Sequence, residues 1–256
     1  MKYFSILLVT AFVLLLFASC GKNDPEEPAP PLLAEHYAIL EAMPQPMLSE
    51  AINTSTDSVA EVIAFSKIEV DKFLNTISGY YLPKEDAVRT TTEVEVVYAE
   101  SRLAERNFLV FYWNNDDNRL VRQLSAEQEN PQQYYLELFQ RTPLSGEAYL
   151  PEIRAWFTTD FTTVTTELHS SYALSDIVYT EVAEELSWQP TEDGSGWSFD
   201  YSKPGGKAFA LVIQADGGGS LNQLFQGKTL YAEWNDRGEG DWNISRDGQT
   251  IKTGSF

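Results

Sequence analysis

The sequence is short of cysteine, histidine and basic residues, and each shortage excludes a class of protein. One cysteine in 256 residues excludes disulfide frameworks and thiolate metal clusters. The two histidines form no H-E-x-x-H motif, so the usual helical zinc-protease site is absent. Only 18 lysines and arginines face 38 acidic residues, and the net charge of −20 excludes nucleic-acid binding by phosphate neutralisation. The content of 43% hydrophobic and 13% aromatic residues nevertheless predicts a folded chain.

Long hydrophobic runs are also scarce. The only one, Ile6 to Phe17, is interrupted by Thr10 and follows the positive charge of Lys2. A helix that spans a bilayer needs about 20 apolar residues, which this run does not reach. A shorter run behind a lysine is typical of a secretory signal, so we expect residues 1–19 to be a signal peptide.

The lone cysteine, Cys20, directly follows Phe17-Ala18-Ser19 at the end of this run. The segment resembles the lipobox of bacterial lipoproteins, in which the cysteine is acylated, for example with palmitate, and becomes the mature N-terminus. The family usually has Leu or a similar aliphatic residue where Phe17 stands. The resemblance implies lipidation at Cys20 and a membrane contact through that anchor.

Gly21 to Glu27, a basic residue followed by acids, resembles the tether of surface-exposed lipoproteins of the Bacteroidetes type. Gly21 occupies the position at which the family's inner-membrane retention signal has Asp. The resemblance therefore implies an outer-membrane lipid anchor and exposure at the cell surface, with the periplasmic face as the alternative. It covers residues 1–27 only and concerns the cellular location of the protein, not its activity.

Proline and helical spacing divide the next part of the chain. Four prolines among residues 24–31 predict an extended, acidic tether over residues 20–31. Residues 32–80 read as a helical segment, with a short helix over Leu32 to Met43 and a longer one that starts at a capping box, Ser58 to Glu61. Apolar residues at helical spacing continue to Ile77, and Gly79 is placed to end the helix.

From about Val88 the pattern has period two, which predicts an antiparallel β domain over residues 88–256. The gaps are too short for crossover helices, so the fold class is α+β, mainly β, with a sandwich, half-barrel or curved meander as the possible arrangements. Ser220 to Phe225 reads as a helical turn. Residues 208–213 are apolar on both faces, which predicts a central strand that is covered on both sides. The predicted strands are 91–98, 107–113, 119–125, 134–141, 154–159, 163–170, 177–181, 185–188, 196–201, 208–214, 229–234, 241–245 and 249–253.

Tryptophans flank polar, glycine-containing turns in a repeated arrangement, with Trp188 and Trp197 around one turn and Trp234 and Trp242 around another. Trp113 to Leu120 is a looser third copy. The structural interpretation is that aromatic pairs clamp the hairpins, each contributing about 0.2–1 kcal/mol. The functional hypothesis is that the four tryptophans form a stacking platform for a glycan.

Other motifs are weaker. Asp236 to Asp241 and Asn114 to Asn118 offer oxygen ligands for calcium but fit no calcium-loop order, and solvated turns explain them better. Gln226 to Thr229 is a chance match to the end of a P-loop. His169 beside Glu167 reads as a structural residue, while His36 belongs to no motif. We therefore assign no catalytic residue, metal ligand or cofactor from the sequence.

Function is expected to follow one of three routes. The first is a lipid-anchored envelope protein that acts as a binding or structural module, with a glycan or an envelope protein as partner. The second is a carboxylate-dependent glycan hydrolase, in which two acids would face each other in a cleft lined by tryptophan. The third is a half-barrel lipoprotein that carries an apolar ligand in a deep apolar groove. Of these we expect the first, without enzymatic activity.

Overall fold

A computed structural model describes the chain over residues 43–78, 88–90, 109–114, 121–130, 133–141, 149–158, 160, 162–174 and 177–256. Several sequence predictions lie outside these residues. They are the signal peptide, Cys20, the tether, nearly all of the helix expected over 32–43, His36, Gly79 and the strand expected over 91–98.

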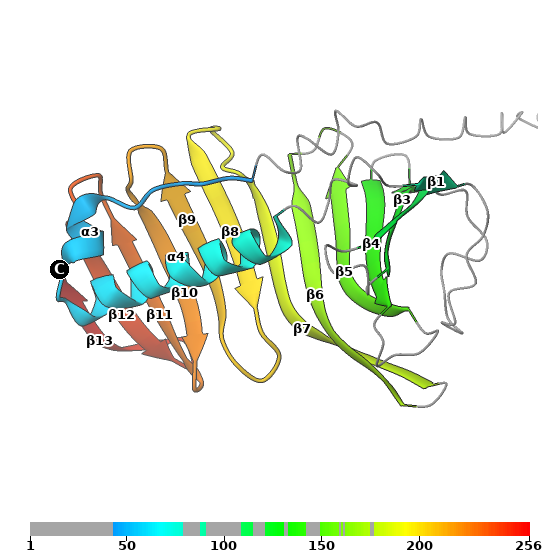
Figure 1. Cartoon of the computed structure of the whole chain (residues 1–256). Helices are drawn as coiled ribbons and strands as arrows, with labels where there is room; N and C mark the ends of the chain where they lie inside the picture. The colour runs from blue at the N-terminus through cyan, green and yellow to red at the C-terminus, as the bar shows by residue number, and fades with distance from the viewer. Residues whose placement is uncertain are drawn as a thin grey trace, which may run out of the picture. The chain divides into compact units, whose positions relative to one another are not determined.

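The described strands form one antiparallel sheet in which each strand pairs with its sequence neighbours, as Figure 1 shows. This confirms a mainly β, α+β fold with an antiparallel sheet. The strand order is that of a meander, whereas a sandwich would divide the strands between two sheets. The strands are β1 (Val88–Thr90), β2 (Leu109–Asn114), β3 (Val121–Asn130), β4 (Gln133–Arg141), β5 (Leu150–Thr158), β6 (Val164–Leu174), β7 (Ile177–Pro190), β8 (Gly196–Ser202), β9 (Ala208–Gln214), β10 (Gly219–Phe225), β11 (Lys228–Trp234), β12 (Gly240–Arg246) and β13 (Gln249–Ser255).

Within the described residues, two helices precede the sheet, α3 (Glu50–Thr54) and α4 (Ser58–Ile77). The predicted start of α4 is wrong by one residue. Asp57 rather than Ser58 is the N-cap, and its carboxylate accepts hydrogen bonds from the amides of Val59 and Ala60 at 2.7 and 3.4 Å. A carboxylate reaches these free amides and also suits the positive end of the helix. The end at Ile77 agrees with the predicted apolar stripe.

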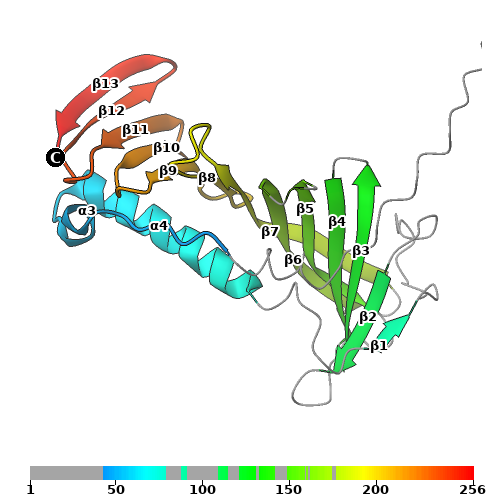
Figure 2. The same cartoon turned by 90° about the horizontal axis from the view of Figure 1, so that it is seen from above.

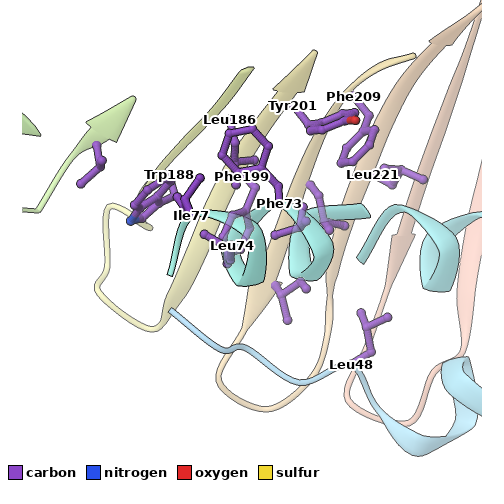
Figure 3. Packing of buried hydrophobic residues seen from close by; sticks show 14 of the residues in the cluster. Leu48, Phe73, Leu74, Ile77, Leu186, Trp188, Phe199, Tyr201, Phe209 and Leu221 are labelled. Atoms are coloured by element: carbon purple, nitrogen blue, oxygen red, sulfur yellow. The ribbon is translucent and has the colours of Figure 1, made fainter. Parts of the chain in front are cut away.

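Helix α4 lies against one face of the C-terminal strands, and this contact forms the main core (Figures 1 and 2). Pairing register aligns Trp188, Phe199, Leu211, Leu221 and Ala232 in one row across β7 to β11. Phe73, Leu74 and Ile77 of α4 pack with this buried cluster, as seen in Figure 3. Full burial of each large apolar side chain contributes about 1.5–3 kcal/mol.

Strand β10 corrects the prediction of a helical turn at residues 220–225. Leu221 and Gln223 are buried while Asn222 between them is exposed, which is the alternation of a strand, and β10 pairs with β9 and β11 along its length. A two-residue turn with positive φ at Gln226 (49°) and Gly227 (71°) joins it to β11. The partial P-loop pattern is therefore a hairpin turn.

Strands β6 and β7 also differ from the prediction. The two short strands expected at 177–181 and 185–188 are one strand of 14 residues, β7, and β6 continues to Leu174. The register shifts after Leu168, where Ala183 is the extra residue on β7. A bulge of this kind lets a long hairpin twist without breaking its pairing, which explains why the alternation seemed to be interrupted.

The strand predicted to be covered on both sides, β9, is central but buried on one face only. Phe209, Leu211 and Ile213 face the core, whereas Ala208, Ala210 and Val212 are half-buried. Helix α4 covers a single face, and small side chains between sheet neighbours lose part of their exposure without any covering layer. Among the strands whose burial is described, β4 is the one buried on both faces, since residues 134–139 are all buried.

Candidate ligand-binding site

A cavity of about 660 Å³ lies between the C-terminal half of α4 and the hairpin β6–β7. It is open to solvent. Helix α4 supplies a stripe of side chains at helical spacing, and the two strands contribute the opposite wall at the position of the bulge. The lining residues are Glu69, Lys72, Phe73, Asn75, Thr76, Leu168 and Glu184.

Both carboxylates of the cavity have cationic partners. Glu184 accepts a hydrogen bond from the Tyr201 hydroxyl at 3.1 Å and from the Lys203 ammonium at 2.9 Å. Glu69 is 3.5 Å from the ammonium of Lys72, one helical turn away. The cavity therefore contains acceptors and donors side by side.

The pKa values of Tyr201 and Lys203 are both raised above their ordinary values. Burial raises the pKa of Tyr201, and the charge of Glu184 and its hydrogen bond raise it further. The hydrogen bond to Glu184, together with its charge, also raises the pKa of Lys203. The Tyr201 ring is fixed by an edge contact with Phe73 (6.5 Å between centroids) and a stacked contact with Phe209 (5.0 Å). The phenol is thus a fixed donor to Glu184.

The tryptophans expected to form an exposed platform are in large part core residues. Trp188 and Trp234 are each only 4% exposed, which corrects the expectation that all four can stack on a ligand. Trp188 packs near Ile77 and Leu74, as Figure 3 shows, and the Trp234 indole donates to the Gly217 carbonyl at 3.0 Å. The physical reason is that these strand positions point toward α4.

Trp197 and Trp242 are half-buried and pack against the same core. Gly254 lies directly under the Trp242 ring, where an added Cβ would be 2.5 Å from a ring carbon. The Lys252 ammonium lies 5.2 Å from the Trp242 ring centroid. Register places Trp188 opposite Phe199 and Trp197 opposite Pro190, so the tryptophans of that hairpin are diagonal neighbours rather than a direct pair.

An aromatic surface that the sequence reading missed lies on the outer part of the β6–β7 hairpin. Tyr172 and Tyr179 are directly paired, with ring centroids 5.0 Å apart and planes inclined by 13°. They are 57% and 42% exposed. Alternation along β6 places Tyr172 on the same face as Leu168 of the cavity. The signal in the sequence is that Tyr172 and Tyr179 lie equally far from the ends of β6 and β7 that face each other, Leu174 and Ile177.

The opposite face of the same strands carries a row of charged side chains. Glu137 of β4 is 4% exposed and accepts a hydrogen bond from Arg154 Nε at 2.8 Å. Arg154 stands opposite Glu167 of β6, which in turn stands opposite Glu185 of β7. Burial, and then the charge of Glu167, raises the pKa of Glu185. Because successive residues alternate, Glu184 faces the cavity while Glu185 belongs to this row.

His169 lies within this charged row. Its Nε2 is 2.9 Å from a Glu167 carboxylate oxygen and its Nδ1 is 3.1 Å from the Thr180 hydroxyl. A hydroxyl, an imidazole and a carboxylate in that order resemble a nucleophile, base and orienting acid. The imidazole is only 2% exposed, however, and the strand amides beside it are engaged in sheet pairing, so no oxyanion site accompanies it.

The segment considered for calcium, Asp236 to Asp241, covers the turn between β11 and β12 and the first two residues of β12. The residue before it, Asn235, accepts hydrogen bonds through its side-chain oxygen from the amides of Arg237 and Glu239 at 2.9 and 3.1 Å, so this oxygen serves the turn. Within the described residues, no group of three His, Cys, Asp or Glu side chains is arranged to hold a metal ion. Of the second loop, only Asn114 is described, at the end of β2.

Comparison with protein-family models, with curated proteins and with solved structures finds no match for the chain. None of the helices in the described part is both long and apolar enough to cross a bilayer.

Proposed function

We propose that the protein is a lipid-anchored module of the cell envelope that binds a glycan in the α4 cavity. The supporting observation is the lining of that cavity, in which two carboxylates, an ammonium, an amide and a hydroxyl surround apolar carbon. Sugar hydroxyls both donate and accept hydrogen bonds, and their C–H faces pack on apolar side chains. An open cavity with donors and acceptors in alternation suits this chemistry.

The tyrosine pair supports the same proposal. Tyr172 and Tyr179 lie on the face of the hairpin that carries the cavity residues Leu168 and Glu184. A pair of nearly parallel, exposed rings offers a flat surface to the C–H face of a sugar. We therefore propose that these tyrosines, rather than the four tryptophans, stack on the glycan.

The anchoring part of the proposal rests on Cys20 and its resemblance to a lipobox. Acyl chains contribute about 0.8 kcal/mol for each CH₂ that enters the bilayer, so several chains hold a protein firmly. Labelling cells with radioactive palmitate tests the anchor, and Cys20→Ala should abolish the label. Protease treatment of intact cells then separates surface exposure in the outer membrane from the periplasmic alternative.

Ligand binding is tested by screening the protein on an array of defined oligosaccharides and titrating any ligand by calorimetry. Replacing Glu184 by Gln removes the charged acceptor of the cavity and should weaken binding about tenfold. Glu192→Gln is the matched control, because Glu192 is an exposed residue of the β7–β8 turn. Absence of binding to the array, or equal binding by both variants in folded protein, would contradict the proposal.

A glycan hydrolase is the second candidate, favoured by the presence of two carboxylates, Glu69 and Glu184, in one cavity. A general acid needs an apolar, unpaired setting, whereas each of these carboxylates has a lysine partner. Release of reducing ends from a bound oligosaccharide, abolished by Glu69→Gln or Glu184→Gln, would support hydrolysis over binding alone. The carrier of an apolar ligand is not favoured, because the same carboxylates and Lys72 line the cavity.

A further inference from the structure

The turn between β8 and β9 presents two lysines to the face of the sheet that carries α4. Lys203 and Lys207 end the two arms of this turn, and the Lys203 amide donates to the Lys207 carbonyl at 2.9 Å. Because side chains alternate along a strand, both lysines share the face of Tyr201 and Phe209, which belong to the core beside α4. Like charges directly opposite each other destabilise a hairpin, so this pair needs compensation.

The two ammonium groups have different partners. Lys203 Nζ is 2.9 Å from a carboxylate oxygen of Glu184 in the cavity. Lys207 Nζ lies 3.6 Å from the centroid of the exposed Phe65 ring on α4, and it makes no hydrogen bond or ion pair with any residue that the structure describes. Even Glu61, one helical turn before Phe65, forms no ion pair with it. The ring attracts one side of the ammonium, so the N–H groups on the other side stay available for a ligand.

Lys207 adjoins the cavity through the Phe65 ring. Lys72, which lines the cavity, has its Nζ 5.9 Å from the centroid of the same ring. Phe65, Glu69 and Lys72 follow one another at helical spacing, so they lie on one face of α4. The Lys207 ammonium therefore extends the row of cavity residues toward the start of the helix.

The charges of this extended cavity do not cancel. Glu69 is paired with Lys72. The other carboxylate, Glu184, is paired with Lys203. Lys207 is left as a positive charge without a carboxylate partner among the described residues. The chain as a whole has a net charge of −20, but charges more than about 8 Å away are largely screened at physiological salt, so an anion at this place meets mainly the lysine.

We propose that the glycan bound in the α4 cavity is acidic, and that Lys207 binds its carboxylate or sulfate group. This specificity rests on the proposed glycan binding and defines its ligand class. An ammonium is a compact charge with three donors, and an oxyanion accepts them in charge-assisted hydrogen bonds. The hydroxyls of neighbouring sugar units remain for Glu184, so the acidic and neutral parts of one glycan are recognised at different ends of the cavity.

An oligosaccharide array that presents each backbone in an acidic and a neutral form tests this specificity. The pairs are uronate oligosaccharides with their methyl esters, and sulfated oligosaccharides with their desulfated forms. We expect the acidic member of a bound pair to bind roughly tenfold more tightly, and the two kinds of pair show whether carboxylate or sulfate is preferred. Equal binding of acidic and neutral members would overturn the acidic specificity while glycan binding stands. Absence of binding to every member would overturn both.

Substitutions of Lys207 then locate the anion. Lys207→Gln should weaken binding of the acidic member roughly tenfold and leave binding of the neutral member unchanged, as measured by calorimetry. The affinity of this variant for the acidic member should also depend less on salt than that of the wild type. Lys207→Arg keeps the positive charge and should keep the preference for the acidic member.

Lys252→Gln is the matched control. Lys252 also lies over an aromatic ring, with its Nζ 5.2 Å from the Trp242 centroid, but it belongs to β13 and does not line the cavity. This variant should bind the acidic member as the wild type does. Equal losses in Lys207→Gln and Lys252→Gln, or no loss in Lys207→Gln, would overturn the assignment to Lys207. If Lys207→Gln does not fold, the acidic and neutral pairs on the array decide alone.

Discussion

Strands β4 and β9 both have apolar side chains on two faces, with Glu137 as the charged exception in β4, yet only β4 is buried on both. Residues 134–139 of β4 are all buried, including Glu137, whereas Ala208, Ala210 and Val212 of β9 are half-buried. Large aromatic side chains such as Tyr135 and Phe139 become fully buried only when other groups pack over them. Small side chains such as Ala210 are already partly buried by their neighbours in the sheet. The difference teaches that the size of the second-face residues is more informative than their polarity.

Truncating the second face of each strand should give the largest contrast. Phe139 is 1% exposed, so Phe139→Ala should lower the free energy of unfolding by about 3–5 kcal/mol through lost burial and a cavity. Val212→Ala, on the half-buried face of β9, should cost less than about 1 kcal/mol. Urea unfolding of both variants measures the difference. Equal losses would mean that β9 is covered on both faces after all.

Charge removal on the same face should give the next largest contrast. Glu137→Ala removes the partner of Arg154, whose side chain is 24% exposed, and should cost about 2–3 kcal/mol. Asp200→Ala, an exposed carboxylate of β8 on the same face of the sheet, should change stability by less than about 0.5 kcal/mol. A Glu137→Gln variant, which keeps an acceptor for Arg154, should recover part of the loss.

Much of the fold could be predicted because it depends on local pattern. The apolar run over residues 208–214 predicted β9 with its observed bounds, and the apolar stripe of α4 predicted the end at Ile77. The predictions failed where the structure of a segment depends on the strands that pair with it. Residues 220–225 form a strand because β9 and β11 provide partners on both sides, and the bulge at Ala183 hides the continuity of β7.

The candidate site was far less predictable. Glu69 and Glu184 are separated by more than 100 residues and share a cavity only because α4 lies against β6 and β7. The sequence analysis predicted tryptophans as the ligand-stacking residues. Trp188 and Trp234 are buried instead, because large apolar side chains gain most from burial in the core. The exposed aromatic pair consists of tyrosines, and it was missed because the strand predicted over 163–170 ends before Tyr172, whereas β6 continues to Leu174 and pairs Tyr172 with Tyr179.

Glu185 of β7 is the last charged residue in the row that begins at Glu137 of β4. Its substitution gives the smallest predicted effect. Burial and the charge of Glu167 raise its pKa above the ordinary value of 4.5, so folding favours the protonated acid. The stabilisation is present below that value and is lost as the pH rises through the pKa of the folded state. Glu185→Gln should therefore match the wild type near pH 4 and raise the Tm by about 1 °C at pH 7, measured by calorimetry. Asp200→Asn, which changes an exposed carboxylate on the same face of the sheet, should show no such pH-dependent gain in Tm. An equal gain would contradict the prediction, because it would mean that burial and the charge of Glu167 do not distinguish Glu185 from Asp200.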